Sequence, residues 1–170
     1  MKKFVLIISC MAALIVFWVK AGAIAKIADG ISITKDGSTP TSGNLAFGTI
    51  IPNAVGGTVV INPFGSGTRI SSGEQVISST YGPAAFTLSG ESNITYAVTL
   101  PSNATITKTD GTQTMMVDSF TSTLSGTGLV VTGKLVGTEG SFKVGGKLHV
   151  PANQLPGSYT GTFTVTAAYN

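Results

Sequence analysis

The stretch PGSYTGTFTVTAAYN, residues 156–170, decides the fold of this chain. From Tyr159 to Tyr169 every second residue is apolar or glycine, and from Thr160 to Thr166 the residues between them are all threonine. A period of two is typical of a β-strand with one buried face. Threonine suits the opposite face, because its branched side chain fits the pleat while its hydroxyl stays in water. The pattern therefore predicts a final strand over residues 158–168.

The same alternation recurs upstream, and no stretch after residue 25 has the apolar spacing of an amphipathic helix. Turn signals such as Asp110-Gly111 and Gly145-Gly146 separate the alternating runs. Short strands with glycine-rich turns, and no break in composition, predict a single all-β domain built as an antiparallel β-sandwich. The predicted strands are residues 26–34, 45–51, 58–62, 74–79, 84–89, 94–100, 104–108, 114–122, 128–136, 141–150 and 158–168.

The N-terminus has the layout of a secretory signal peptide. Lys2 and Lys3 precede an apolar run over residues 4–19, and Ala21-Gly22-Ala23 supplies small residues for cleavage. We expect residues 1–23 to be removed and residues 24–170 to form the mature domain, with residues 24–43 as an extension or a first strand. An uncleaved anchor helix and a lipoprotein signal ending at Cys10 are the alternatives.

Processing changes the charge of the chain. The whole sequence carries ten basic and seven acidic residues, a formal charge of +3. Removal of Lys2, Lys3 and Lys20 leaves seven basic residues against seven acids, so the mature chain is neutral. Neutrality argues against nucleic acid and anionic membranes as partners. Cys10 leaves as well, so the mature domain has no disulfide.

The sequence offers little catalytic or metal-binding chemistry. His149 is the single histidine, and alternation places it on the solvent face of its strand. One histidine without cysteine gives no zinc set. The acids lie near glycines in predicted turns, so no calcium loop or catalytic carboxylate pair is expected. A Ser-His-Asp arrangement with Asp118 is not excluded by count, although no nucleophile elbow is present. We expect no enzyme, no metal and no cofactor.

The final segment resembles the C-terminal signature of bacterial pilins assembled by the chaperone–usher pathway. That resemblance implies an immunoglobulin-like (pilin-like) sandwich that lacks one strand, with a periplasmic chaperone and an usher as partners. A neighbouring subunit then supplies the missing strand and self-association produces a polymer. The residues expected to form the assembly and chaperone contact are Gly157, Tyr159, Phe163, Val165, Ala167 and Tyr169.

Two further segments, NLAFGTIIP (residues 44–52) and VGGKLHVPANQ (residues 144–154), are similar to the secreted bacterial β-domains named DUF4402. The resemblance covers about residues 31–169 and implies a fold but no single activity. The expected function is a non-enzymatic structural subunit of a fimbria-like assembly in the periplasm or at the bacterial surface. The alternative is a self-complete adhesion or ligand-binding module that uses loops such as residues 63–83 or 110–128.

The sequence does not decide which segment would be the donor strand for such an assembly. Ile27, Ile31 and Ile33 share one alternating face and form the candidate donor, with Asp29 between them. If residues 31–34 are instead the first strand, residues 24–30 reach only about 23 Å at about 3.3 Å each, which is short of a full groove.

Overall fold

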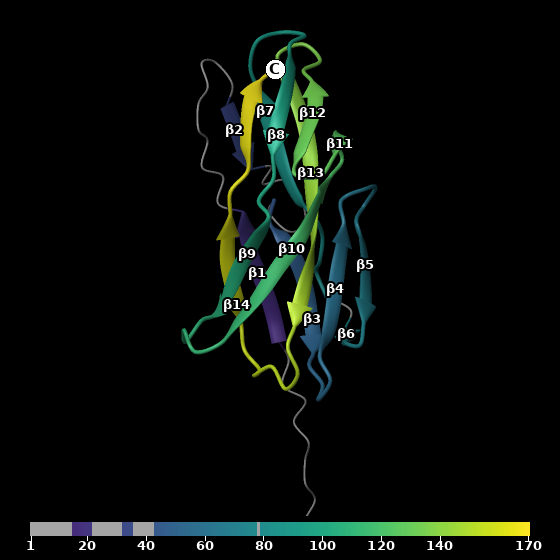
Figure 1. The fold of residues 1–170 in the computed structure, drawn as a ribbon, viewed down its shortest axis with the longest axis vertical. Helices are drawn as coiled ribbons and strands as arrows, with labels where there is room; N and C mark the ends of the chain where they lie inside the picture. Colours follow the sequence, from purple (N-terminus) through teal and green to yellow (C-terminus); the bar gives the residue numbers. More distant parts are fainter. Residues whose placement is uncertain (1–14, 22–31, 36–42, 78) are drawn as a thin grey trace, which may run out of the picture.

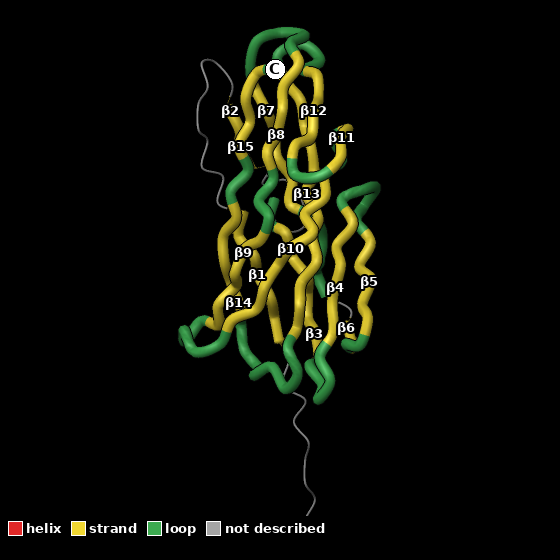
Figure 2. Tube along the Cα trace, viewed as in Figure 1, coloured by secondary structure: helices red, strands yellow, loops and turns green. Residues whose placement is uncertain are grey.

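The computed structural model describes residues 15–21, 32–35, 43–77 and 79–170. Every regular element in these residues is a β-strand, as Figure 2 shows, so the predicted all-β class is confirmed. No helix in the described part of the chain is long and apolar enough to cross a membrane. The strands are β1 (Ile15–Ala21), β2 (Ser32–Lys35), β3 (Leu45–Ile51), β4 (Gly57–Asn62), β5 (Thr68–Ser72), β6 (Gln75–Ile77), β7 (Ala84–Ser89), β8 (Thr95–Thr99), β9 (Asn103–Lys108), β10 (Thr114–Ser122), β11 (Ser125–Thr127), β12 (Val130–Lys134), β13 (Glu139–Val150), β14 (Tyr159–Phe163) and β15 (Thr166–Tyr169).

The strands form two sheets that pack as a sandwich. The larger sheet has the order β2-β7-β13-β10-β9-β14-β1-β3-β6, and the β4–β5 hairpin joins it through β13. The smaller sheet has the order β11-β12-β8-β15. In Figure 1 the molecule is elongated, with the smaller sheet in the half that holds the C-terminus and β1, β3, β9 and β14 in the other half.

The long strand β13 connects the two halves. Its first part, residues 139–144, pairs with β7, and its last part, residues 146–150, pairs with β4. Gly145 and Gly146 lie where the partner changes, and a Cβ on Gly145 would overlap the carbonyl oxygen of Ile61. The glycine pair therefore allows β4 to approach β13 closely, which gives the predicted turn signal a different role inside a strand.

The C-terminal alternation is confirmed, but the strand that it predicts is divided. Residues 159–161 of β14 pair with β9 in the larger sheet, and residues 166–169 pair with β8 in the smaller one. A strand that passes from one sheet of a sandwich to the other keeps its inward face while it changes partners. The alternation with a period of two indicates which side chains point inward. It carries no information about where the chain passes from one sheet to the other.

The core is continuous through both halves and is rich in aromatic residues. Phe86 stacks on Phe142 with ring centroids 5.1 Å apart, and the edge of Phe163 meets Phe86 at 6.4 Å. Phe120 lies against Phe163 at 5.0 Å. Tyr159, Phe163, Val165 and Ala167 are all buried, so the C-terminal strand contributes one whole face to this core.

Three strands were not expected from the sequence. β5 (Thr68–Ser72) is mostly polar and has no apolar face to reveal it, and β11 (Ser125–Thr127) is a short exposed edge. β1 (Ile15–Ala21) lies in the predicted signal peptide. Of the predicted strand over residues 26–34, only the end falls in β2 (Ser32–Lys35), and residues 26–31 lie outside the described residues.

Candidate functional site

The candidate site is the space between β14 and β3, which we call the slot. β1 fills it, running parallel to β14 on one side and antiparallel to β3 on the other. Figure 1 shows β1 in purple beside both strands. In the strand order β14 and β3 are joined only through β1 within the described residues. The backbone edges of both strands that face the slot therefore depend on this one strand for their pairing.

The register defines what the slot accepts. Phe17 pairs with Tyr159, Val19 with Gly161 and Ala21 with Phe163. Tyr159 and Phe163 are buried, whereas Thr160 and Thr162 between them are exposed. On the other wall, Leu45 and Ile50 of β3 are completely buried. A strand in the slot thus continues a sheet whose inner face is apolar.

Most of the predicted contact residues lie in the molecule's own core. Phe163, Val165 and Ala167 are each at most 4% exposed, and Tyr159 is completely buried. Tyr169 is half-buried, and its hydroxyl accepts a hydrogen bond of 2.7 Å from the backbone N–H of Glu91. The edge of β14 that faces the slot is backbone, so a partner there would form strand pairing first. The predicted role of these residues in assembly stays a prediction.

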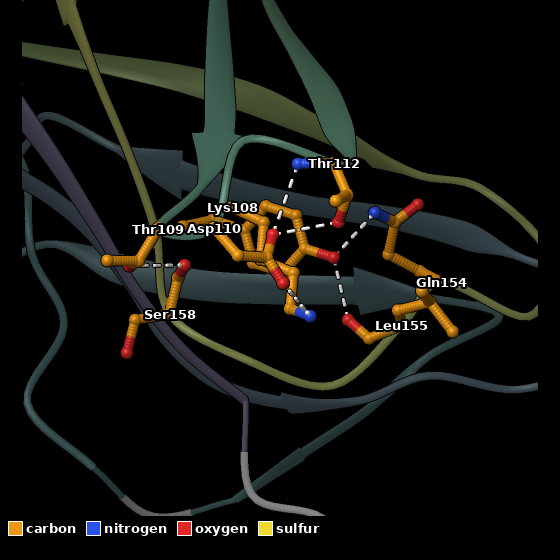
Figure 3. A network of polar contacts seen from close by, with 8 residues as sticks. Lys108, Thr109, Asp110, Thr112, Gln154, Leu155 and Ser158 are labelled. Carbon is orange, nitrogen blue, oxygen red and sulfur yellow. Dashed lines mark hydrogen bonds and ion pairs between the residues drawn. The ribbon is translucent and has the colours of Figure 1, made fainter.

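A polar network fixes the point where the C-terminal strand begins. Figure 3 shows it around the hairpin between β9 and β10. The N–H and hydroxyl of Thr109 donate to the carbonyl of Ser158, at 2.9 and 3.0 Å. Asp110 accepts a hydrogen bond from Lys108 at 2.6 Å and two from Thr112. These bonds, from Lys108 first and Thr112 second, lower the pKa of Asp110 to about 2.

Tyr159 makes buried hydrogen bonds at the same end of β14. Its hydroxyl donates to the carbonyl of Leu155 at 2.6 Å and accepts a bond of 2.8 Å from Nε2 of the buried Gln154. Gly157 has a φ of 151°, and a Cβ there would meet the side chain of Lys108. Gly157 and Tyr159, both singled out in the sequence, therefore position the start of β14.

The other wall of the slot, β3, is held from behind by Arg69 of β5. Its Nη1 donates to the carbonyl of Phe47 at 3.1 Å, and its Nη2 donates to the carbonyl of Ile77 at 2.7 Å. The guanidinium also lies 4.4 Å from the ring centroid of Tyr81. Burial lowers the pKa of Arg69, which stays a cation at neutral pH.

Gly48 makes room for that guanidinium. It sits in β3 with a φ of 78°, and a Cβ there would overlap Nη1 of Arg69 and come within 2.6 Å of Oγ of Ser79. Two physical reasons thus explain why glycine occupies this position in the segment NLAFGTIIP: the positive φ of the backbone and the close approach of Arg69. Sequence analysis used this glycine for the family resemblance but missed Arg69, because β5 itself was not predicted.

The candidate donor residues are only partly within the described residues. Ile33 lies in β2 and pairs with Leu88 of β7, at the edge of the larger sheet opposite β6. Ile27 and Ile31 lie outside the described residues. Ile33 thus pairs with a strand of the same chain, and the role of Ile27, Ile31 and Ile33 as a donor stays a prediction.

Among the described residues, His149 and Asp118 form a side-chain pairing that resembles catalytic chemistry. Nε2 of His149 lies 2.9 Å from Oδ1 of Asp118, and this hydrogen bond is the main reason why the pKa of Asp118 is lowered. Ser119 donates to Asp118 at 2.9 Å, so its hydroxyl is bonded to the acid and not to the histidine. That order does not activate a serine nucleophile. Among the described residues no group of three His, Cys, Asp or Glu side chains lies close enough to hold a metal.

Glu74, between β5 and β6, is a buried carboxylate. It is 6% exposed, and neither carboxylate oxygen has a hydrogen-bond partner among the described residues. Burial raises its pKa. An unpaired acid in this position costs stability, because desolvation disfavours its charged form.

Comparison with protein families gives one result for the chain. The family model described as Domain of unknown function (DUF4402) matches residues 31–169, which include every described strand from β2 to β15. No curated protein matches this chain. The match starts after the strand that fills the slot, so β1 is not part of the family domain.

Proposed function

This chain belongs to the DUF4402 family, and on that premise we propose that it is a non-enzymatic, secreted structural subunit that assembles by accepting a β-strand into the slot. The subunit is fimbria-like and works in the periplasm or at the bacterial surface. A periplasmic chaperone and an usher are its partners before assembly, and further copies of the chain are its partners in the polymer. The proposed role requires neither a cofactor nor a catalytic site.

One observation carries this proposal. The strand between β14 and β3 comes from residues 15–21, which lie within the predicted signal peptide and outside the family domain. Cleavage after Ala23 would remove that strand and leave two backbone edges beside an apolar core. Unpaired edges of this kind pair readily with another chain. Addition of a strand supplies main-chain hydrogen bonds for affinity and side-chain pockets for specificity.

The second candidate function is a self-complete binding or adhesion module. A specific observation favours it. Two hollows on the surface are lined by residues from the predicted binding loops, including Phe64 from residues 63–83 and Ser125 from residues 110–128. This function needs no added strand in the slot. The two candidate functions therefore predict different results when a peptide that could fill the slot is added: binding for the first and no binding for the second.

The test offers the slot a strand. The processed chain, residues 24–170, is mixed with a peptide of residues 15–21 carrying terminal lysines for solubility. A control peptide has Phe17→Asp and Val19→Asp, at the positions in register with Tyr159 and Gly161. At a hundredfold excess over Kd the matching peptide stabilises the domain by about 2.7 kcal/mol. For a domain of this size that corresponds to a rise in Tm of roughly 5–10 °C.

A second readout follows assembly itself. Polymers of the processed chain are counted by electron microscopy with and without residues 24–34, and with the matching peptide added. We expect the peptide to reduce polymer formation and the control peptide to leave it unchanged. Equal Tm shifts from both peptides, or polymers of normal abundance when the slot is blocked, would contradict strand complementation. A monomer that ignores both peptides would support the self-complete module.

A further inference from the structure

A second surface feature lies away from the slot, around the exposed ring of Phe64. This ring is 59% exposed and stands between two hollows of about 440 and 320 Å³. Phe64 and Thr121 line both hollows, so the two hollows adjoin at these residues, and together we call them the cleft. A large aromatic ring left in water between two hollows indicates a contact site.

The cleft combines apolar surfaces with hydroxyl groups. Phe120, Leu124 and Val131 are among the residues that line the larger hollow, and the first and last of these belong to the buried core. The smaller hollow has Val60 and Ile70 on its walls, and Ile70 is 60% exposed. The hydroxyl and amide side chains of the lining are Asn62, Ser119, Thr121, Ser122, Thr123 and Ser125.

Lys147 is the one charged residue among the described residues that line the two hollows. Lys147 lines the smaller hollow, and its ammonium makes no salt bridge with any described residue. Asp118 lies opposite Lys147 in the strand register. Its pKa is lowered first by the hydrogen bond with His149 and also by the charge of Lys147, so the lysine acts on this carboxylate although the two form no salt bridge. No acidic residue is among the described residues that line either hollow. A ligand with a negative group therefore gains an attraction here that a neutral ligand lacks.

The loop that carries Phe64 is held in place. Oδ1 of Asn62 accepts a hydrogen bond of 2.9 Å from the N–H of Phe64, and the carbonyl of Phe64 accepts one of 3.1 Å from Gly67. Lys143 reaches across from β13 and donates to the carbonyl of Gly65 at 2.8 Å. A loop backbone held in this way loses little conformational freedom when a ligand arrives.

From these features we propose that the cleft binds an acidic saccharide. The C–H face of one sugar ring packs on Phe64, its hydroxyl groups bond with the Ser, Thr and Asn side chains, and its carboxylate meets Lys147. Asn62, Ser119, Ser122 and Thr123 each make one hydrogen bond within the protein and keep further bonding capacity for a ligand. An apolar peptide would not use that capacity, and a purely ionic ligand would not use the aromatic ring. The inference is independent of the slot, because none of the lining residues belongs to β3 or β14.

The probe is a set of uronate oligomers, with neutral glucose oligomers of the same length for comparison. Binding to the processed chain is measured by titration calorimetry at low and at physiological salt. The chain should bind the uronates more tightly than the neutral oligomers, with an advantage that decreases as salt rises. Phe64→Ala should weaken uronate binding by tenfold or more, and Lys147→Gln should remove the preference for the acidic oligomer.

Matched controls separate the cleft from the general surface. Val136→Ala removes another exposed apolar side chain, 84% exposed, and Lys134→Gln removes another exposed cation, both outside the cleft lining. Both controls should bind uronates like the unchanged chain, and all variants should keep its Tm. The proposal is overturned if no uronate binds, if Phe64→Ala binds normally, or if a polyglutamate peptide of equal charge binds as tightly as the uronate.

Discussion

Replacing Gly48 by alanine should destabilise the domain far more than the same change at a glycine with an equal φ. An alanine held at a φ of 78° costs about 1–2 kcal/mol in backbone strain. The new Cβ would also overlap Nη1 of Arg69, so the guanidinium must leave its place. The strain and the displaced arginine are separate costs, and each can be measured by itself.

The cost of displacing Arg69 follows from its contacts. The side chain gives up hydrogen bonds to the carbonyls of Phe47 and Ile77, at 3.1 and 2.7 Å, and its contact with Tyr81. For a half-buried cation we expect these contacts to be worth about 2–3 kcal/mol together. Gly48→Ala should therefore cost about 3–5 kcal/mol, which lowers Tm by roughly 6–20 °C for a chain of this length.

The matched control is Gly111→Ala in the β9–β10 hairpin. Gly111 also has a φ of 78°, but a Cβ there meets nothing within 4 Å. This variant should show the strain alone, about 1–2 kcal/mol. The difference between the two glycine variants then measures what is lost when Arg69 and Ser79 move away from the new Cβ, and Arg69→Ala separates the part that belongs to the arginine.

The assay is urea unfolding of the processed chain followed by circular dichroism, with Arg69→Ala and the double variant included. Because Gly48→Ala already removes the arginine contacts, the double variant should be about 2 kcal/mol more stable than the sum of the single effects predicts. Additivity within about 0.5 kcal/mol would refute the reasoning, since independent sites add to that precision. Equal losses for Gly48→Ala and Gly111→Ala would refute it as well.

Three further predictions concern groups around the two walls of the slot. Tyr159→Phe leaves the buried amide of Gln154 without its partner and should cost about 1–3 kcal/mol in urea unfolding, which Gln154→Leu in the same chain should partly restore. Asp110→Asn should lower stability at pH 7 but not near pH 2, because an acid whose folded pKa is lowered to about 2 stabilises the fold above its unfolded pKa and loses that effect as pH falls. Glu74→Leu should raise stability by about 1–3 kcal/mol at pH 7, with a smaller gain at pH 4, because an acid with a raised pKa costs most when it is fully ionised. For the acids, pH profiles that run parallel to that of the unchanged chain would count against the assignments.

Most strands could be predicted from the sequence because alternation depends only on which side chains of a strand are buried. That burial pattern does not depend on which strands are its neighbours. The runs at residues 45–51, 84–89 and 114–122 coincide with β3, β7 and β10. β5 was missed because Arg69 fills the place of an apolar side chain and uses its hydrogen bonds in the interior. The change of sheet after Phe163 was missed because alternation continues through it.

The slot and the cleft were harder to predict, because both depend on pairing between distant segments. Residues 15–21 have the composition of a targeting signal, and nothing in that composition indicates pairing with residues 159–163. The cleft brings Phe64 beside Thr121 through the separate pairings of β4 and β10 with β13. Sequence could identify the two loops as candidates for binding, but only the register of β13 places them together.

The arrangement of the two sites has a consequence for how such a subunit would work. In the larger sheet β9 separates β14 from β10, so the strand that would accept a partner is not a neighbour of the strands that line the cleft. Filling the slot changes the pairing of β14 and β3 and leaves β10, β13 and β4 with the partners they already have. A neutral, hydroxyl-covered subunit of this kind could therefore be stacked into a polymer while every copy keeps its cleft open to solvent. Measured together, the uronate affinity should be the same in monomer and polymer, and a loss of binding on polymerisation would show that the cleft lies at the subunit contact.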